Sequence, residues 1–131
     1  MHPLDFGVVG SALGLVIDEQ SADLVRVNWQ VSPALHQPAG ILHGGIHCWV
    51  VETLASVGAS TWLDQQHGGG VVVGVSNQTD FYRPVSEGQL TSTATPVHRG
   101  RTQQVWVVET QDAGGRLLAR GQVRLQNLAP R

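Results

Sequence analysis

Residues 40–63 read GILHGGIHCWVVETLASVGASTWL, and they interrupt a chain that is otherwise organised in short alternating segments. Apolar side chains recur along this stretch at the three- and four-residue spacing of a helix with a broad apolar surface. They are Ile46, Trp49, Val50, Leu54, Val57, Ala59 and Trp62. Because the stretch is rich in β-branched residues, helix propensity contributes little and burial has to stabilise it. We therefore predict one long buried helix from Gly45 to about Leu63.

Segments of alternating apolar and polar residues lie on both sides of this helix. Leu24 to Val31 alternates cleanly, and Leu13 to Asp18 is expected to pair with it across a turn at residues 19–23. Four further strands are predicted at residues 71–83, 90–98, 102–110 and 117–127, with a hairpin turn at residues 112–115. Short connections favour antiparallel neighbours. The predicted fold class is α+β, with one antiparallel sheet wrapped around one long helix.

Length and composition indicate a single domain over residues 1–131, with its core at about 13–127. Hydrophobic residues make up 41% and charged residues 14%, a balance that favours a buried core over disorder. The net charge is −2 and the eight basic residues are all arginine, so nucleic-acid binding is not expected. The single Cys48 excludes an internal disulfide and a cysteine-rich zinc module. With no targeting segment, and with Glu52 inside the longest apolar stretch, we expect a cytoplasmic protein without a membrane partner.

The turn into the predicted helix carries two adjacent glycines, Gly44 and Gly45. The first N–H groups of a helix have no partner within the helix, and the positive end of its dipole points outward there. Glycine also lets a ligand approach the backbone closely. Such a helix end can hold an anion or polarise a carbonyl oxygen. The alternative is a sharp loop-to-helix turn without a ligand.

Glu52 follows Gly44 by eight residues, just over two helical turns, and so lies roughly on the same side of the helix. A carboxylate on a helix covered by a sheet requires a partner or a cleft, because burial of an unpaired charge is costly. Glu52 is therefore either a nucleophile or general base, or a structural residue that reaches solvent. Ser56, one turn further on, can hydrogen-bond Glu52, a water or its own helix backbone.

His43 and His47 have the i, i+4 spacing of a metal pair on a helix. The residues between them lack the inner glutamate of the zinc-protease pattern, and the sequence offers no convincing third ligand. We therefore predict neither a metal nor a separate cofactor.

Three motifs together resemble the hotdog-fold acyl-CoA thioesterases. They are Gly40-x-x-His43-Gly44-Gly45 with Glu52 on the following helix, the run GVSNQTDFYRPVSEG at residues 74–88, and His98-x-Gly100-Arg101-Thr102. The resemblance covers nearly all of residues 13–127. It is to the phenylacetate-pathway branch and its 4-hydroxybenzoyl-CoA thioesterase relatives, which place a glutamate on the helix.

The resemblance implies a hotdog fold and hydrolysis of an aromatic or other bulky acyl-CoA. In such an enzyme the N–H of Gly44 polarises the thioester carbonyl and Glu52 acts as nucleophile or general base. Gln37 orients the thioester or the water, His43 belongs to the same catalytic turn, and Ser56 stands where that branch often has threonine.

The resemblance also implies the contacts to coenzyme A and the assembly. The expected substrate-binding residues are Gly45, Asn77, Arg83, Arg101 and Thr102, and coenzyme A enters as part of the substrate. Members of the branch are homotetramers built from dimers, with the site at the dimer interface. A hotdog hydratase or dehydratase and a non-catalytic acyl-CoA sensor are the alternatives. The first usually uses a histidine base in a different motif, and the second usually carries a DNA-binding extension.

Overall fold

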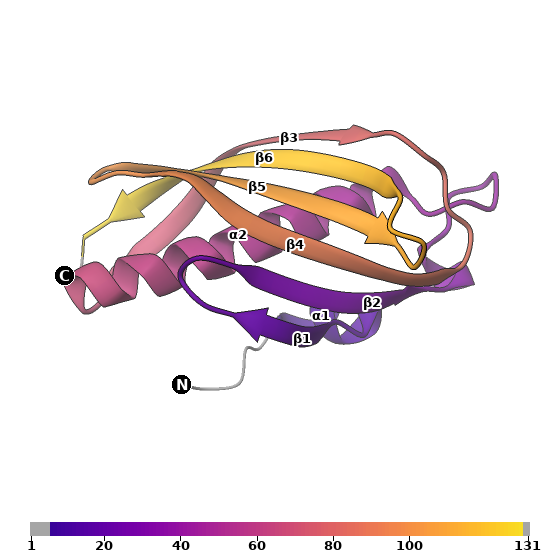
Figure 1. Cartoon of the computed structure of the whole chain (residues 1–131), viewed down its shortest axis with the longest axis horizontal. Helices are drawn as coiled ribbons and strands as arrows, with labels where there is room; N and C mark the ends of the chain where they lie inside the picture. The colour runs from indigo at the N-terminus through magenta and orange to yellow at the C-terminus, as the bar shows by residue number, and fades with distance from the viewer. Residues whose placement is uncertain (1–5, 130–131) are drawn as a thin grey trace.

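A six-stranded antiparallel sheet curves around one long helix in the computed structural model, which describes residues 6–129 (Figure 1). In chain order the elements are α1 (Gly7–Leu13), β1 (Val16–Gln20), β2 (Val25–Val31), the 3-10 turn η1 (Pro33–Leu35), α2 (Gly44–His67), β3 (Val71–Phe81), β4 (Gly88–Arg99), β5 (Gln103–Asp112) and β6 (Leu117–Leu128). The predicted α+β architecture is confirmed, and the predicted strands after the helix agree with the observed ones to within two residues.

The strand order across the sheet is β1-β2-β4-β5-β6-β3. Each neighbouring pair is antiparallel, so the strand that directly follows α2 crosses to the far edge and pairs only with β6. This places the start of α2, the end of β3 and the β5–β6 hairpin at one end of the molecule (Figure 1). The candidate site lies at that end.

The core is formed where the apolar side of α2 meets the concave face of the sheet. Val50, Val51 and Leu54 on α2 are fully buried, as is Trp106 on β5. Gly58 is needed for this contact, because a Cβ at that position would lie 2.5 Å from the Trp106 ring. The helix therefore approaches β5 at a glycine, and burial supplies the stability that its β-branched residues do not.

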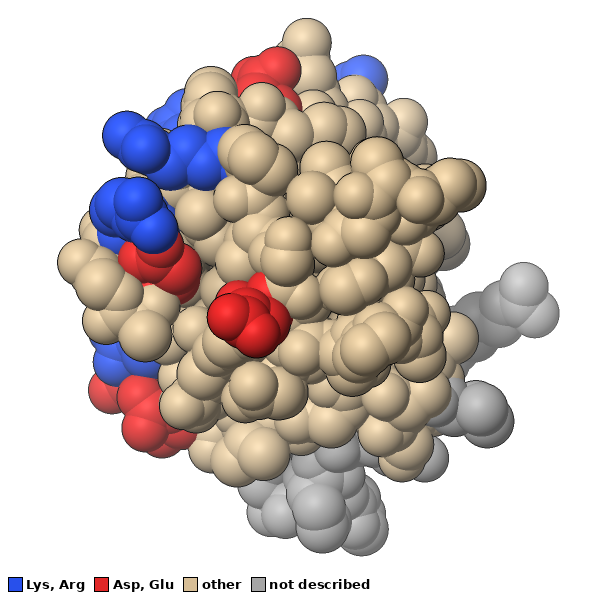
Figure 2. Space-filling model, turned by 90° about the vertical axis from the view of Figure 1, so that its right-hand side faces the viewer, with Lys and Arg blue, Asp and Glu red and all other residues tan. Residues whose placement is uncertain are grey.

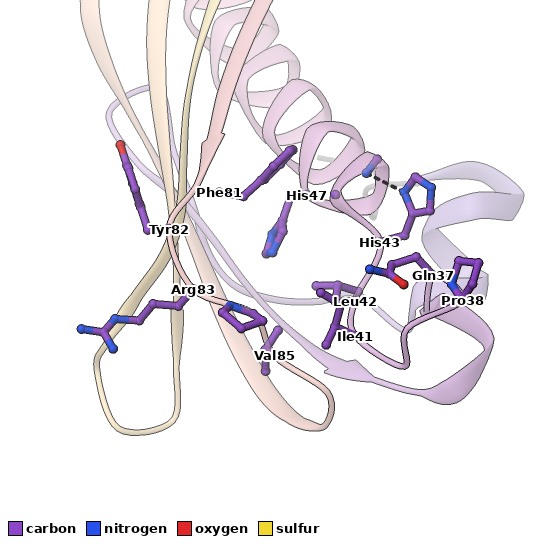
Figure 3. A pocket seen from close by; sticks show the side chains of 13 residues that line it. Gln37, Pro38, Ile41, Leu42, His43, His47, Phe81, Tyr82, Arg83 and Val85 are labelled. Atoms are coloured by element: carbon purple, nitrogen blue, oxygen red, sulfur yellow. Dashed lines mark hydrogen bonds between the residues drawn. The ribbon is translucent and has the colours of Figure 1, made fainter.

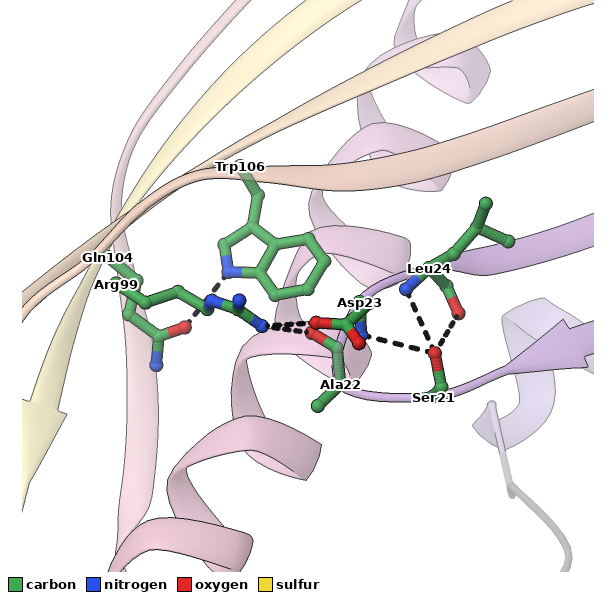
Figure 4. Close-up of polar contacts among 7 residues, drawn as sticks. All are labelled: Ser21, Ala22, Asp23, Leu24, Arg99, Gln104 and Trp106. Atoms are coloured by element: carbon green, nitrogen blue, oxygen red, sulfur yellow. Dashed lines mark hydrogen bonds and ion pairs between the residues drawn. The ribbon is translucent and has the colours of Figure 1, made fainter.

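A buried amide on β5 fixes the second half of α2 to the sheet, and Figure 4 shows the contact of this amide with Trp106. Gln104 is fully buried; its side chain donates to the carbonyl of Ala59 (3.1 Å) and accepts from the indole N–H of Trp106 (2.9 Å). Nearby, Arg99 donates to the carbonyl of Ala22 (2.8 Å) and so ties the β1–β2 turn to β4. Satisfied buried polar groups of this kind specify one arrangement of helix on sheet.

The structure differs from the sequence prediction at the N-terminal end. Gly7–Leu13 form α1 and β1 begins only at Val16, whereas we predicted a strand from Leu13. Two glycines and two valines in seven residues give this segment low helix propensity, so the sequence offers no helical signal. Tertiary packing decides instead: Leu13 is buried in the core, and Gly14 ends the helix in the left-handed conformation (φ 66°).

The long helix also extends further than predicted. It begins at Gly44 and ends at His67, where Gly68 adopts a left-handed conformation (φ 65°). None of the helices described in residues 6–129 is long and apolar enough to span a membrane.

Candidate active site

The first turn of α2 leaves one backbone donor unused. His43 is the N-cap, and its Nδ1 accepts a hydrogen bond from the N–H of Gly45 (2.8 Å). The N–H of Ile46 donates to the carbonyl of His43 (3.0 Å). The N–H of Gly44 has no acceptor among the described residues. Because Nδ1 of His43 accepts, a neutral His43 ring carries its proton on Nε2. The turn therefore offers two donors, the Gly44 N–H and the His43 Nε2–H.

Both glycines of this turn are also required by packing. A Cβ on Gly44 would lie 2.8 Å from Cε2 of Phe81, the last residue of β3. A Cβ on Gly45 would lie 2.9 Å from Nδ1 of His43. The sequence suggested close approach of a ligand as the reason for glycine. The structure adds that the end of β3 covers Gly44 and that the His43 cap needs a small neighbour.

A pocket of about 710 Å³ opens beside the start of α2 (Figure 3). Its walls are mostly apolar, with Ile41, Leu42, Phe81 and Val85 among them. A volume of this size falls in the range of small-molecule sites. Gly44, whose N–H is free, is one of the residues that line this pocket.

Gln37 and Arg83 lie at this pocket in different ways. The Oε1 of Gln37 accepts from the N–H of Ala39, which leaves the Gln37 amide group as a donor on the pocket side (Figure 3). The guanidinium of Arg83 points away from the pocket toward the outside of the molecule (Figure 3). At this end of the molecule arginine side chains gather along one margin, and most of the face is uncharged (Figure 2).

Glu52 lies in a different hollow. Its side chain is exposed on α2 beside Gly74 of β3, where a Cβ would lie 3.4 Å from Cδ of Glu52. Trp49 and Ser56 line the same hollow of about 370 Å³. Within the described part of the chain Glu52 has no hydrogen bond or ion pair among the side-chain contacts. Eight residues of helix separate it from Gly44 by about 12 Å along the axis, too far for both to act on one carbonyl.

The residues expected to contact coenzyme A do not form one cluster within a chain. Asn77 lines a small hollow with Glu52, but its amide donates to the carbonyl of Cys48 (3.0 Å) and accepts from Thr79 (2.7 Å). It therefore holds β3 against α2. Arg101 and Thr102 are exposed in the β4–β5 turn, near the end of α2, whereas Arg83 lies near its start.

His47 is the residue whose position sequence reasoning did not anticipate. It was considered as a metal ligand with His43, yet no group of three or more His, Cys, Asp or Glu among residues 6–129 has metal-binding geometry. The ring is buried between Trp29 and Phe81, and burial lowers the pKa of His47 to about 4. Its Nδ1 has no hydrogen-bond partner among residues 6–129. The four-residue spacing places it one turn inside the helix, but gives no sign of which strands it meets.

Comparisons with known proteins all find esterases or thioesterases. Residues 39–119 match the family model described as "Thioesterase superfamily". The chain is 49% identical over 121 residues to the Mycobacterium tuberculosis protein named "Putative esterase Rv1847", covering 92% of this chain and 86% of that one. It is 36% identical over 104 residues to "Proofreading thioesterase EntH" of Klebsiella pneumoniae, covering 79% and 74% of the two chains.

Two solved structures are similar over nearly the whole chain. One is that of the same M. tuberculosis protein, with a TM-score of 0.90, 48% identity and coverage of 94% of this chain and 98% of that chain. The other is AziG of S. sahachiroi, with a TM-score of 0.90, 55% identity and coverage of 96% and 100%.

Proposed function

The chain belongs to the thioesterase superfamily and is a thioester hydrolase, and from this premise we propose that it hydrolyses an aromatic or other bulky acyl-CoA. The observation that carries the proposal is the unused N–H of Gly44, a residue that lines an apolar pocket. When a thioester carbonyl is attacked, its oxygen gains negative charge. A preorganised N–H at a helix start stabilises that charge, and loss of one such donor typically lowers the rate about 10²–10³-fold.

Glu52 supplies the nucleophile or activates the water in this proposal. Because it lies about 12 Å from Gly44 in its own chain, it acts on a thioester bound at the Gly44 of a second copy. The arrangement of β3 supports this. Phe81 at the end of β3 packs on Gly44, whereas Gly74 near its start lies beside Glu52. If two β3 strands pair antiparallel, the end of one lies along the start of the other. Each Gly44 then comes next to the partner's Glu52.

The exposed edge of the sheet is suited to such pairing. β3 has eleven residues and, in the described part of the chain, one neighbouring strand, and it exposes Val71 (61%), Val73 (44%) and Val75 (52%). A long, apolar, unprotected edge strand is a template for pairing with another chain. We therefore propose a dimer through β3 as the working unit. Following the resemblance described above, we propose a tetramer built from two such dimers. The proposed cytoplasmic location follows from the sequence features described above.

The remaining residues have roles that fit this composite site. The amide of Gln37 and the Nε2–H of His43 point donors toward the thioester, and Ser56 orients Glu52 or the water. Trp49 provides a flat apolar surface beside Glu52 for a bulky acyl group. Arg83 meets the phosphates of coenzyme A from outside the pocket.

Antiparallel pairing of β3 would also bring together the expected coenzyme A contacts, Arg83 and the Arg101–Thr102 turn, which lie apart within one chain. Val71 pairs with Leu128, and Leu128 lines a hollow with Arg101 and Thr102. The start of the partner's β3 therefore brings Arg101 and Thr102 of the second copy toward the Arg83 end. A 36% identical relative is named "Proofreading thioesterase EntH", and this name supports hydrolysis of a thioester.

Substitution of Glu52 tests this function. We expect Glu52→Gln to lower kcat at least about 10²-fold with little change in KM, measured as thiol release over a panel of aromatic and aliphatic acyl-CoAs. Asp64→Asn, an exposed acid on the same helix, is the control and should retain wild-type turnover. Near wild-type turnover by Glu52→Gln contradicts the catalytic role. Binding of acyl-CoA by the wild type without thiol release contradicts hydrolysis and favours the sensor class.

A further inference from the structure

Asn77 joins β3 to α2 one helical turn before Glu52. Its side-chain amide donates to the carbonyl of Cys48 (3.0 Å), and its Oδ1 accepts from the hydroxyl of Thr79 (2.7 Å). Within α2 the Cys48 carbonyl also accepts the N–H of Glu52, because helical hydrogen bonds join residues four apart. The amide of Asn77 and the backbone of Glu52 are therefore bonded to the same oxygen.

A β-bulge beside Glu52 turns Asn77 toward the helix. Between Gly74 and Ser76 the pairing of β3 with β6 shifts by one residue, so residue 75 is an extra residue in β3. A Cβ on Gly74 would lie 3.4 Å from Cδ of Glu52, so Gly74 faces α2. In a regular strand Ser76 would share the face of Gly74, but the extra residue gives that face to Asn77 instead. Bulges are enriched next to active sites, where they redirect side chains in this way.

The amide of Asn77 is held in one orientation by Thr79. Because a carbonyl oxygen only accepts, the amide nitrogen has to face Cys48, and the amide oxygen is left for the Thr79 hydroxyl. Thr79 pairs with Gly121 of β6, where a Cβ would lie 2.5 Å from Oγ1 of Thr79. Gly121 therefore leaves room for the hydroxyl that orients Asn77.

Two simpler roles do not account for these contacts. The sequence predicted that Asn77 contacts coenzyme A, but its amide oxygen and one amide N–H are already used within the chain. The Cys48 carbonyl does not need Asn77 as a partner either, since it has one within the helix. What the bond adds is a fixed position for this turn of α2 relative to β3. The side chain of Glu52 is exposed, so the place of its carboxylate depends on the position of that turn.

We propose that Asn77 is a positioning residue, oriented by Thr79, that fixes the Glu52 turn of α2 for attack on the thioester. The proposal rests on the role of Glu52 proposed above and adds the residues that hold it in place. Without this bond the turn can shift relative to β3, and a misplacement of about 1 Å can lower a rate about 10²-fold. Because Asn77 acts on Glu52 and not on the substrate, the loss falls on kcat and not on KM.

Four single variants measure this role on the acyl-CoA that the wild type hydrolyses fastest. Asn77→Leu removes the amide at similar volume and should lower kcat at least about tenfold, with KM within about twofold of the wild type. Thr79→Val removes the orienting hydroxyl and should lower kcat by a smaller factor, whereas Thr79→Ser keeps the hydroxyl and should retain wild-type kcat. Gln122→Leu removes an exposed amide from β6 and is the control, with wild-type turnover expected. Thermal unfolding shows which variants are folded, and if Asn77→Leu is not, the two threonine variants decide.

A double-mutant cycle with Glu52→Gln separates positioning from a merely structural role. If Asn77 acts through Glu52, its loss has no further effect once the carboxylate is absent. The double variant should then react within about twofold of Glu52→Gln alone, measured in single-turnover assays with excess enzyme. A structural or substrate-binding role would instead lower the rate by the same factor in both backgrounds.

Three outcomes would overturn the proposal. They are wild-type kcat in Asn77→Leu, an equal loss from Asn77→Leu with and without the Glu52 carboxylate, and equal kcat in Thr79→Val and Thr79→Ser. In each of them the wild type still hydrolyses acyl-CoA and still depends on Glu52, so the proposed function stands. Absence of hydrolysis by the wild type, or full activity of Glu52→Gln, contradicts the proposed function and this proposal with it.

Discussion

Gly44 is constrained at the same time by packing and by the chemistry proposed for it. Its Cα faces the Phe81 ring, and its N–H is the free donor of the first helical turn. These two constraints can be separated, because proline and alanine both add a Cβ against Phe81 but only proline removes the N–H. Proline is tolerated at the first helical position, and the backbone of His43 (φ −66°, ψ 130°) already has the conformation favoured before proline.

We therefore expect Gly44→Pro to lower kcat about 10²–10³-fold below Gly44→Ala, since only the proline variant lacks the oxyanion donor. Both variants share the cost of displacing Phe81, which appears as an equal drop in thermal stability. Steady-state thiol release and thermal unfolding measure the two effects. Equal turnover of the two variants would show that the Gly44 N–H takes no part in the reaction.

At the residue scale the sequence predicted which groups the long helix carries, but not which residues of other elements contact them. The glycine turn and the acid eight residues on are local features of one helix, so their spacing was readable. The contact of Phe81 with Gly44, and the burial of His47 between Phe81 and Trp29, join residues far apart in the chain. Periodicity within one segment holds no information on such partners, and the burial of His47 between these two rings was therefore not predicted.

The second half of helix α2 is positioned on the sheet by two contacts. One is made by a glycine of the helix, and the other by a buried amide on β5. The Cα of Gly58 faces the Trp106 ring, and Gln104 bonds the carbonyl of Ala59, the next residue. A methyl at Gly58 would lie 2.5 Å from the ring, and neither the indole, held by its N–H bond to Gln104, nor the helix can move freely. This contact decides the distance between helix and sheet.

We expect Gly58→Ala to lower the free energy of unfolding by about 1–3 kcal/mol through overpacking. The gain in helix propensity, at most about 1 kcal/mol, acts in the opposite direction and is smaller. Ser60→Ala, at an exposed position two residues on, should leave stability unchanged or raise it slightly. Urea denaturation of the three proteins measures the difference. A Gly58→Ala protein as stable as the wild type would show that Trp106 and α2 can move apart without loss.

At the element scale the prediction succeeded where periodicity is strong and failed where it is weak. β2 and α2 carry clear alternation or helical spacing over seven or more residues, and both were located. α1 has two glycines and two valines in seven residues, and only its contacts with the rest of the fold make it helical. Strand order was beyond the sequence as well, since the placement of β3 at the edge depends on the whole sheet.

At the scale of the whole molecule, the two residues that the proposed mechanism combines, Gly44 and Glu52, lie on two different surfaces of one chain. The Gly44 pocket lies at one end of α2, and Glu52 lies in a hollow beside Gly74 on the exposed edge strand. Antiparallel pairing of two β3 edges has twofold symmetry. It therefore brings the Gly44 pocket of one chain next to Glu52 of the other at each end of the paired strands. The proposed dimer would therefore have two equivalent sites, each with Gly44 from one chain and Glu52 from the other.

Subunit mixing tests this arrangement directly. Gly44→Pro and Glu52→Gln chains are each nearly inactive alone, but in a mixed dimer the intact Glu52 of the first faces the intact Gly44 of the second. If equal amounts of the two chains are co-refolded, about a quarter of all sites contain both intact groups, so thiol release should recover to about a quarter of the wild-type rate. The control is a mixture of Glu52→Gln with a chain that carries both substitutions, which forms no intact site. Recovery no greater than in that control would place Gly44 and Glu52 of one site in the same chain, and the exposed β3 edge would then need a different explanation.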